Sequence, residues 1–303
     1  RNNFVMFGLN KIIPTNSNYQ FMNIRNMMLY ISVSLVIISL LLLIFKGLNL
    51  GIDFKGGTLI EVRTQNSDIS ELRKILNYSF NDVSLQEFGD SETIIIRLQN
   101  ESNLESITTI NKVKELISDK ISEFRRSEFV GPTISEELLR KGLQAISLAL
   151  FAILIYIWFR FEWQFGISIL IALIHDVLIT LGILSILSID FSLSSIAAML
   201  TIVGYSVNDS VVIFDRVREN LRKYKKLDLI ELFNMSINNT LSRTIMTSMT
   251  TLLALLSLFI FGGEVIQPFA FTMIIGVIIG TYSSIWIAVP SLLLFKFRPQ
   301  DDE

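Results

Sequence analysis

The chain has 303 residues, of which 51% are hydrophobic and 18% charged, and its mean hydropathy is +0.53. This composition excludes an ordinary soluble domain and indicates a protein largely embedded in a membrane. A net charge of −2 gives no basic stripe, so we expect no nucleic-acid partner. The absence of Cys and the single His exclude thiolate and His-cluster metal sites, and we expect neither a metal nor another cofactor.

Six apolar runs are long enough to cross the hydrocarbon core as helices, which takes about 17–25 residues. They are Met27–Phe45, Leu143–Phe159, Phe165–Leu187, Phe191–Phe214, Thr244–Phe261 and Phe269–Phe295. The first is expected to be an uncleaved anchor, because Phe45-Lys46-Gly47 follows it instead of a small-residue cleavage site. Residues 27–45 are therefore assigned to the first span and residues 142–295 to the other five.

Lys and Arg near the ends of these runs predict orientation, because short cytoplasmic flanks are enriched in both. They gather on one side of the predicted membrane, at Arg25, Arg160, Lys296, Arg298 and six positions between 216 and 226. The short loops on the other side, near Asp190 and Glu264, contain neither residue type. Residues 1–26 and 296–303, and with them both termini, are expected to be cytoplasmic.

Residues 46–141 are expected to form a domain on the opposite, extracytoplasmic side. Its predicted elements are strand Thr58–Arg63, helix Asp68–Phe80, strand Val83–Phe88, strand Thr93–Leu98, helix Leu104–Phe124 and a strand near Glu128–Ile134. Asp68 and Glu71 fit a helix cap, and residues 89–92 fit a hairpin turn. The order βαββαβ predicts a ferredoxin-like α+β domain. The fold class is thus a polytopic α-helical membrane protein with six spans and one such domain.

Ionisable residues inside the spans are the candidate functional groups, because a charge at mid-membrane costs at least about 2.5–3.5 kcal/mol on insertion scales. His175 and Asp176 lie mid-span, either as a structural polar pair or as part of a proton path. Asp209, next to Asn208, lies six residues inside Asp215 and hence about 9 Å deeper. It is either a group that gains and loses a proton or a satisfied hydrogen-bond partner.

Arg243 begins the fifth span and shares a helix face with Thr247 and two further threonines. It is either an interfacial residue that snorkels to the cytoplasmic surface or the counter-charge of Asp209, with the hydroxyls as a polar track. In the last span, Gly276 and Gly280 have the spacing that permits close helix packing. No phosphate-binding loop, nucleophile elbow or zinc-protease motif occurs, so enzymatic catalysis is not expected.

Five stretches resemble the SecD/SecF family of protein-export membrane proteins, and the resemblance covers nearly the whole chain. They are Gly51–Thr58 with Asp53, Gly56 and Gly57; Gly131-Pro132; Ala172–Val177; Gly204–Asn220 with Asp215 and Arg216; and Ser242–Ser248. This family is counted among the resistance-nodulation-division transporters, and the SecF-type members have six spans and one external domain between the first two.

The resemblance implies a bacterial inner-membrane protein that couples the proton-motive force to polypeptide export. It implies SecD, the SecYEG translocon, YajC, exported polypeptides and membrane lipid as partners. It further implies that Asp209 and Arg243 form the proton-coupling pair, with His175, Asp176, Asn208 and Thr247 in a secondary role. 

Two alternatives remain open: half of a proton-driven exporter of small molecules or lipids, and a non-energised translocon scaffold. The scaffold predicts that Asp209 and Arg243 tolerate neutral substitution whereas Gly276 and Gly280 do not.

Overall fold

The computed structural model describes residues 17–64, 69–80, 83–88, 90–98, 103–263 and 266–295. The predicted tail 296–303, residues 1–16 and the positions Asp68, Gly89 and Glu264 lie outside this part of the chain. The chain divides into two compact units. A helical unit comprises Arg1–Leu48, Ile146–Ile189 and Ser194–Glu303, and a smaller unit comprises Asn49–Ala145 and Asp190–Leu193.

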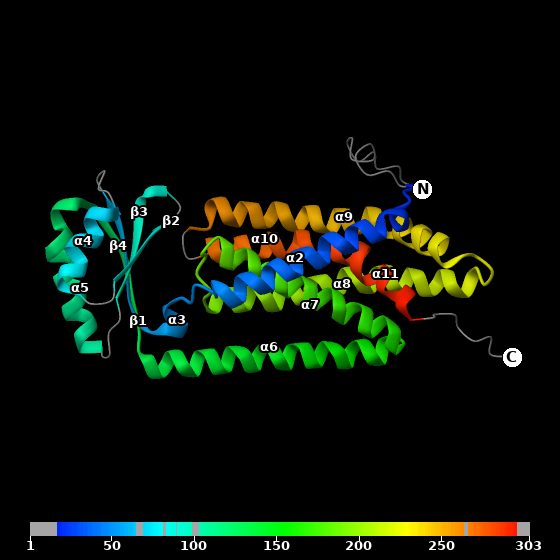
Figure 1. Cartoon of the computed structure of the whole chain (residues 1–303), viewed down its shortest axis with the longest axis horizontal. Coiled ribbons are helices and arrows are strands. Elements are labelled where there is room, and N and C mark those ends of the chain that lie inside the picture. The colour runs from blue at the N-terminus through cyan, green and yellow to red at the C-terminus, as the bar shows by residue number, and fades with distance from the viewer. Residues whose placement is uncertain are drawn as a thin grey trace, which may run out of the picture. The chain divides into compact units, whose positions relative to one another are not determined.

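Six helices in the described residues are long and apolar enough to cross a membrane, which confirms the predicted number of spans. The helical elements are η1 (Phe21–Ile24), α2 (Arg25–Phe45), α6 (Pro132–Arg160), α7 (Trp163–Ile186), α8 (Leu193–Lys223), α9 (Leu229–Phe261) and α10 (Gln267–Ser283). After α10 the helix continues through a π-helical turn, η3 (Ser284–Ala288), α11 (Val289–Ser291) and η4 (Leu292–Leu294). Helices α2, α7, α8, α9 and α10 run side by side (Figure 1).

Three helices extend well beyond their predicted spans. Helix α6 begins at Pro132, eleven residues before the predicted start at Leu143. Helix α8 continues past Phe214 to Lys223, and α9 begins at Leu229, well before Thr244. The start of α9 is fixed by Asp228, whose carboxylate accepts a hydrogen bond from the Ile230 N–H at 3.0 Å. Hydropathy marks only the part of a helix that is apolar, so it misses such amphipathic extensions.

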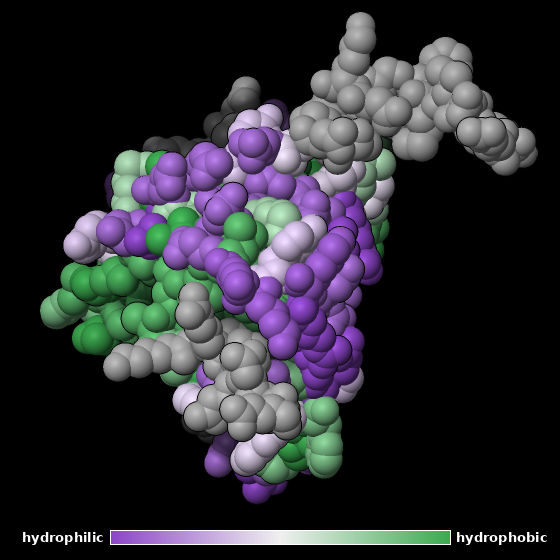
Figure 2. All heavy atoms as spheres, turned by 90° about the vertical axis from the view of Figure 1, so that its right-hand side faces the viewer, coloured by the Kyte–Doolittle hydropathy of each residue, from purple (hydrophilic) through white to green (hydrophobic). Residues whose placement is uncertain are grey.

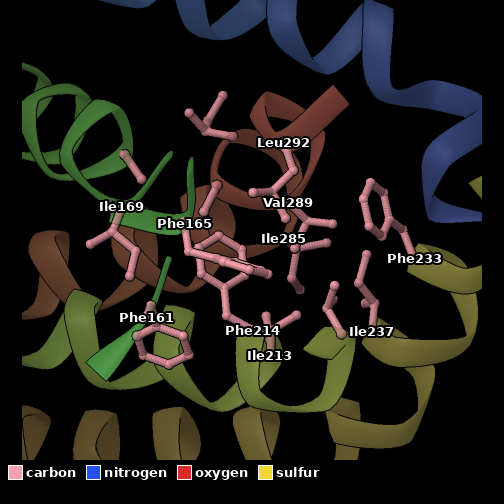
Figure 3. Close-up of a cluster of buried hydrophobic side chains, with 14 of the residues drawn as sticks. Phe161, Phe165, Ile169, Ile213, Phe214, Phe233, Ile237, Ile285, Val289 and Leu292 are labelled. Carbon is pink, nitrogen blue, oxygen red and sulfur yellow. The ribbon is translucent and has the colours of Figure 1, made fainter. Parts of the chain in front are cut away.

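A core of aliphatic and aromatic side chains holds α7, α8, α9 and the end of the last span together (Figure 3). Phe165 of α7 packs edge-on against Phe214 of α8 with ring centroids 5.1 Å apart, and both are fully buried. Phe233 of α9 and Val289 of α11 complete the same cluster. Because these rings exclude lipid and water, they fix the helix positions around the polar groups described below.

Glycines let α10 approach α8 closely, as the sequence suggests. A Cβ atom built on Gly276 would lie 2.2 Å from the side chain of Ile202, and one on Gly280 would lie 3.2 Å from Ser206 Cβ. A side chain at Gly276 would require Ile202 to move, and one at Gly280 would require Ser206 to give way by a few tenths of an ångström.

The smaller unit contains α3 (Ile52–Lys55), β1 (Gly57–Thr64), α4 (Ile69–Ser79), β2 (Val83–Phe88), β3 (Asp90–Leu98), α5 (Asn103–Ile117), the turn η2 (Ser118–Lys120) and β4 (Ile121–Val130). All strand pairs are antiparallel, in the order β2-β3-β1-β4. Helices α4 and α5 cover one face of the sheet (Figure 1) and bury Ile60, Val62, Ile94 and Ile96. The predicted βαββαβ arrangement is confirmed.

Two local predictions in this unit are wrong. The helix expected to run to Phe124 ends at Ile117, and residues from Ile121 onward pair with β1. The predicted last strand near Glu128–Ile134 is therefore displaced, and Ile134 belongs to α6. The hairpin is also tighter than a turn over residues 89–92, because Phe88 pairs with Asp90.

Candidate functional site

Helix α7 buries a histidine–aspartate pair. His175 and Asp176 are 5% and 1% exposed, and the His175 Nδ1 atom lies 2.9 Å from Asp176 Oδ1. The other carboxylate oxygen of Asp176 accepts hydrogen bonds from Ser206 Oγ at 2.6 Å and Ser283 Oγ at 2.8 Å. Asp176 therefore binds groups on α7, α8 and α10, and its acceptor capacity is well filled. The His175 ring stacks on Tyr282, with centroids 6.1 Å apart.

Asp209 occupies the middle of α8. It lies 16 residues after Leu193 and 14 before Lys223, or about 24 and 21 Å along the helix axis. Its side chain is 3% exposed, and Oδ2 accepts one long hydrogen bond, of 3.4 Å, from Ser284 Oγ. The buried Thr244 hydroxyl lies beside this carboxylate. Unlike Asp176, Asp209 retains unused acceptor capacity in a buried setting.

The two carboxylates belong to one polar seam. Ser206 and Asp209 lie three residues apart on α8, and Ser283 and Ser284 are adjacent where α10 passes into η3. Ser206 and Ser283 bind Asp176, whereas Ser284 binds Asp209. A change at either carboxylate therefore acts on side chains of the same two helices.

The seam coincides with an irregular helix. Ser284–Ala288 is a π-helical turn, and Pro290 follows it in α11. A proline lacks the N–H that an α-helix needs and clashes with the carbonyl four residues earlier, which accounts for the widened turn. Single π-turns of this kind are rare and occur frequently at functional sites.

A second polar chain connects α8, α9 and α10. The Tyr205 hydroxyl donates to Ser248 Oγ at 3.1 Å, and Ser248 Oγ lies 2.7 Å from Thr281 Oγ1. Helix α9, which carries Arg243 and Thr244, is thereby tied to the helices that form the seam.

Arg243 is exposed and makes no ion pair with Asp209 in the part of the chain that the structure covers. It lies near enough for its charge to attract that of Asp209. Thr247 Oγ1 donates to the Arg243 carbonyl of its own helix at 2.8 Å, and Thr250 bonds the Met246 carbonyl in the same way. The α9 threonines thus form no continuous hydrogen-bonded track toward Asp209.

One side of α8 is left uncovered. Thr201, Gly204 and Asn208 follow a helical spacing and are all exposed. A Cβ built on Gly204 would meet nothing within 4 Å. On α9, Arg243 and Thr250 are exposed as well, so polar groups lie on the outside of two membrane helices.

The signature residues of the smaller unit form a compact turn. Gly56 and Gly57 have φ angles of +74° and +108°, which only glycine adopts without strain. The Asp53 carboxylate accepts a hydrogen bond from the Leu193 N–H at 2.9 Å, and Phe191 exchanges backbone hydrogen bonds with residues 49–51. These glycines and Asp53 therefore organise the segment that receives residues 190–193.

Asp190 is held at this same place. It pairs with Arg97 and accepts a 2.6 Å hydrogen bond from Asn49 Nδ2. Burial raises the pKa of the Asp190 carboxyl above its ordinary value, against the opposing effect of Arg97.

The remaining signature residues lie at the C-terminal end of α8. Asp215 forms a bidentate pair with Arg160 at 2.8 and 2.9 Å, and Arg216 pairs with Glu219 at 2.6 Å. They do not contact the seam. No cluster of three or more His, Asp or Glu side chains able to hold a metal is found among the described residues.

Sequence reasoning did not single out Ser206, Ser283 and Thr244. Ser206 lies inside the longest family-like stretch, Gly204–Asn220, and Ser283 follows the glycine pair of the last span. The sequence offers only a weak signal for Ser206, the three-residue spacing that places it on the same helix face as Asp209, and it offers none for Ser283.

Comparison with known proteins gives consistent matches. Residues 109–298 match the family described as "Protein export membrane protein SecD/SecF, C-terminal", and residues 41–68 match the "SecD/SecF GG Motif". The "Protein translocase subunit SecF" of Rickettsia bellii is 46% identical over 290 residues, covering 94% of this chain and 96% of that protein. The Rickettsia rickettsii protein of the same name is 45% identical over 293 residues and 95% of each chain.

Solved structures agree with this result. A crystal structure of SecDF, described as a translocon-associated membrane protein from Thermus thermophilus, is similar with a TM-score of 0.85 and 36% identity over 93% of this chain. A SecDF structure in a "Super-membrane-facing form" has a TM-score of 0.69 at the same identity and coverage. This chain spans 39% of each of those chains. The chain therefore belongs to the SecD/SecF family of protein-export membrane proteins and is of the SecF type.

Proposed function

We propose that this chain works with a SecD subunit in the bacterial inner membrane and couples the proton-motive force to export of polypeptides through the SecYEG translocon. The proposal includes cytoplasmic termini and an extracytoplasmic position for the smaller unit, which rest on the distribution of Lys and Arg. The observation that carries it is the buried seam in which Asp176 and Asp209 bind serines of shared helices.

Asp209 is the better candidate for the group that takes up a proton. Its buried carboxylate has one long hydrogen bond, whereas Asp176 has two short ones from serines besides its contact with His175. Protonation of Asp209 would remove the charge that Arg243 attracts and allow Ser284 and Thr244 to reorient. Because Ser284 lies in a π-turn, a small change there alters how the last span packs.

The available energy is sufficient for such a step. One charge crossing 100 mV yields about 2.3 kcal/mol, and each pH unit adds about 1.36 kcal/mol. One proton therefore biases a two-state rearrangement by tens-fold or more without nucleotide hydrolysis.

A SecD partner is supported by the open sides of α8 and α9. Exposed Thr201, Asn208 and Arg243 would be poorly solvated in lipid, and a second helical subunit would cover them. The 39% coverage of SecDF chains is consistent with a chain that supplies part of a larger assembly.

The test uses vesicles that contain the translocon, SecD and this chain. Asp209→Asn is expected to abolish the stimulation of export by an imposed proton-motive force while the subunits still co-purify. Glu231→Gln, which removes an exposed carboxylate from the first turn of α9, should leave the stimulation intact. Full stimulation in the Asp209→Asn vesicles would refute the mechanism and favour a scaffold.

A further inference from the structure

An open pocket of about 430 Å³ lies in the helical unit between the end of α6 and the C-terminal turns of α8. It is lined by Arg160, Asp215, Arg218, Glu219, Arg222 and Lys223. Four cations and two anions give this lining a formal charge of 4 − 2 = +2. The pocket is separate from the Asp176–Asp209 seam, and the proposed function does not use it.

Both acidic residues of the lining are already paired. Asp215 binds Arg160, and Glu219 binds Arg216, which is not part of the lining. The other cations are Arg218, Arg222 and Lys223, and none of them has an acidic partner among the residues that the structure describes. The pocket is therefore a place where positive charge is left over.

The walls of the pocket are firmly held. Arg160 and Asp215 are the chain neighbours of Phe161 and Phe214, which point into the packed core (Figure 3) and are 5% and 0% exposed. The Arg160 guanidinium also lies 4.9 Å from the Phe161 ring centroid. Arg218 Nη1 donates to the Arg160 carbonyl at 3.4 Å, and its Nε atom is buried without a partner. Arg160, Asp215 and Arg218 therefore form a held wall of the pocket, beside the exposed Arg222 and Lys223.

Aromatic residues place the pocket at the level of the lipid headgroups. Trp158 and Phe159 at the end of α6 are 78% and 90% exposed, and Trp163 at the start of α7 is 56% exposed. Exposed tryptophans at helix ends mark the membrane–water interface. Figure 2 shows hydrophilic residues gathered at this end of the helical unit, beside apolar helix surface.

We propose that this pocket binds the phosphate of an anionic phospholipid headgroup. Guanidinium groups match phosphate oxygens with paired hydrogen bonds, and basic pockets between membrane helices on the cytoplasmic side are a known setting for anionic lipids. Tyr156, which lies one turn before Arg160 on the same face of α6 and is 54% exposed, offers an apolar ring surface for an acyl chain. A free phosphate ion shares the headgroup chemistry and lacks this second contact.

The experiment titrates the full chain in detergent with phosphatidylglycerol, phosphatidylcholine or inorganic phosphate and counts bound molecules by native mass spectrometry. Phosphatidylglycerol is expected to bind at least tenfold more tightly than phosphatidylcholine. Arg218→Gln with Arg222→Gln should weaken it about 25-fold, at about fivefold per cation removed. Lys226→Gln, which removes a nearby exposed charge outside the lining, should leave the affinity within twofold.

A gain of affinity provides an outcome that misfolding cannot imitate. Glu219→Gln removes a negative charge from an exposed side chain of the lining and should tighten phosphatidylglycerol binding severalfold. The proposal would be overturned if the two lipids bound equally well, or if Lys226→Gln lost as much affinity as the double arginine variant. It would also be overturned if Glu219→Gln gave no gain, or if inorganic phosphate saturated the site at the concentrations that suffice for lipid.

Discussion

Removal of the Ser206 hydroxyl should destabilise the helical unit measurably, whereas removal of the Ser168 hydroxyl should not. Both serines are at most 1% exposed, and both lose only one oxygen when replaced by alanine. They differ in partner: Ser206 donates to the Asp176 carboxylate at 2.6 Å, and Ser168 Oγ has no hydrogen-bond partner in the structure. The comparison therefore isolates one hydrogen bond to a buried charge.

The magnitude follows from the acceptor. Neutral side-chain hydrogen bonds between membrane helices average about 0.6 kcal/mol, whereas bonds to charged groups contribute about 1.5–3 kcal/mol. Ser206→Ala should lie in the second range, because the carboxylate stays buried and loses one of its serine donors. Ser168→Ala should be neutral or slightly stabilising, since it removes a buried hydroxyl that is unpaired.

The assay is reversible unfolding of the purified chain in mixed micelles, followed by circular dichroism as the mole fraction of denaturing detergent rises. It measures the free energy of unfolding of the Ser206→Ala and Ser168→Ala variants. Ser206→Ala with Ser283→Ala is expected to cost more than the sum of the single changes, because Asp176 then keeps only His175. If Ser206→Ala and Ser168→Ala differ by less than about 0.5 kcal/mol, the hydrogen bonds do not hold the seam together.

The same unfolding assay checks three further predictions. Gly276→Ala should cost about 1–3 kcal/mol, because the added methyl group meets the buried Ile202, whereas Gly204→Ala should be tolerated. Glu61→Gln should destabilise the smaller unit by about 3–5 kcal/mol, because this fully buried carboxylate pairs with two arginines of β4. The raised pKa of Asp190 means that its contribution to stability is present at acidic pH, below its ordinary pKa, and is lost as pH rises through the raised value. Asp190→Asn should flatten this part of the pH profile; an unchanged profile would assign the titration to another group.

The membrane helices and the domain between the first two were predictable, because long apolar runs and the order of strands and helices leave few alternatives. The end of α5 was not. Val113, Ile117, Ile121 and Phe124 follow a helical spacing, so the pattern favours one continuous helix. Pairing of Ile121–Val130 with β1 overrides that local pattern, and only the assembled sheet reveals it.

The seam shows a similar limit. A buried carboxylate such as Asp209 stands out in an apolar run, since its cost is high. A serine in a membrane helix costs little, so Ser206 and Ser283 give no comparable signal, and their partners depend on which helix faces meet. The role of Arg243 was also ambiguous in the sequence, because a long side chain in the first turn of a span can either reach the interface or point inward.

The backbone hydrogen bonds between residues 49–51 and Phe191, with the Asp53 contact to Leu193, have a consequence for how the chain is made. The smaller unit includes Asp190–Leu193, and 44 residues, Ile146–Ile189, lie between Ala145 and this segment. At about 5–20 residues per second, synthesis of that stretch takes about 2–9 s. All four strands are therefore synthesised before this segment, and the smaller unit can complete its contacts only after the third span has been synthesised.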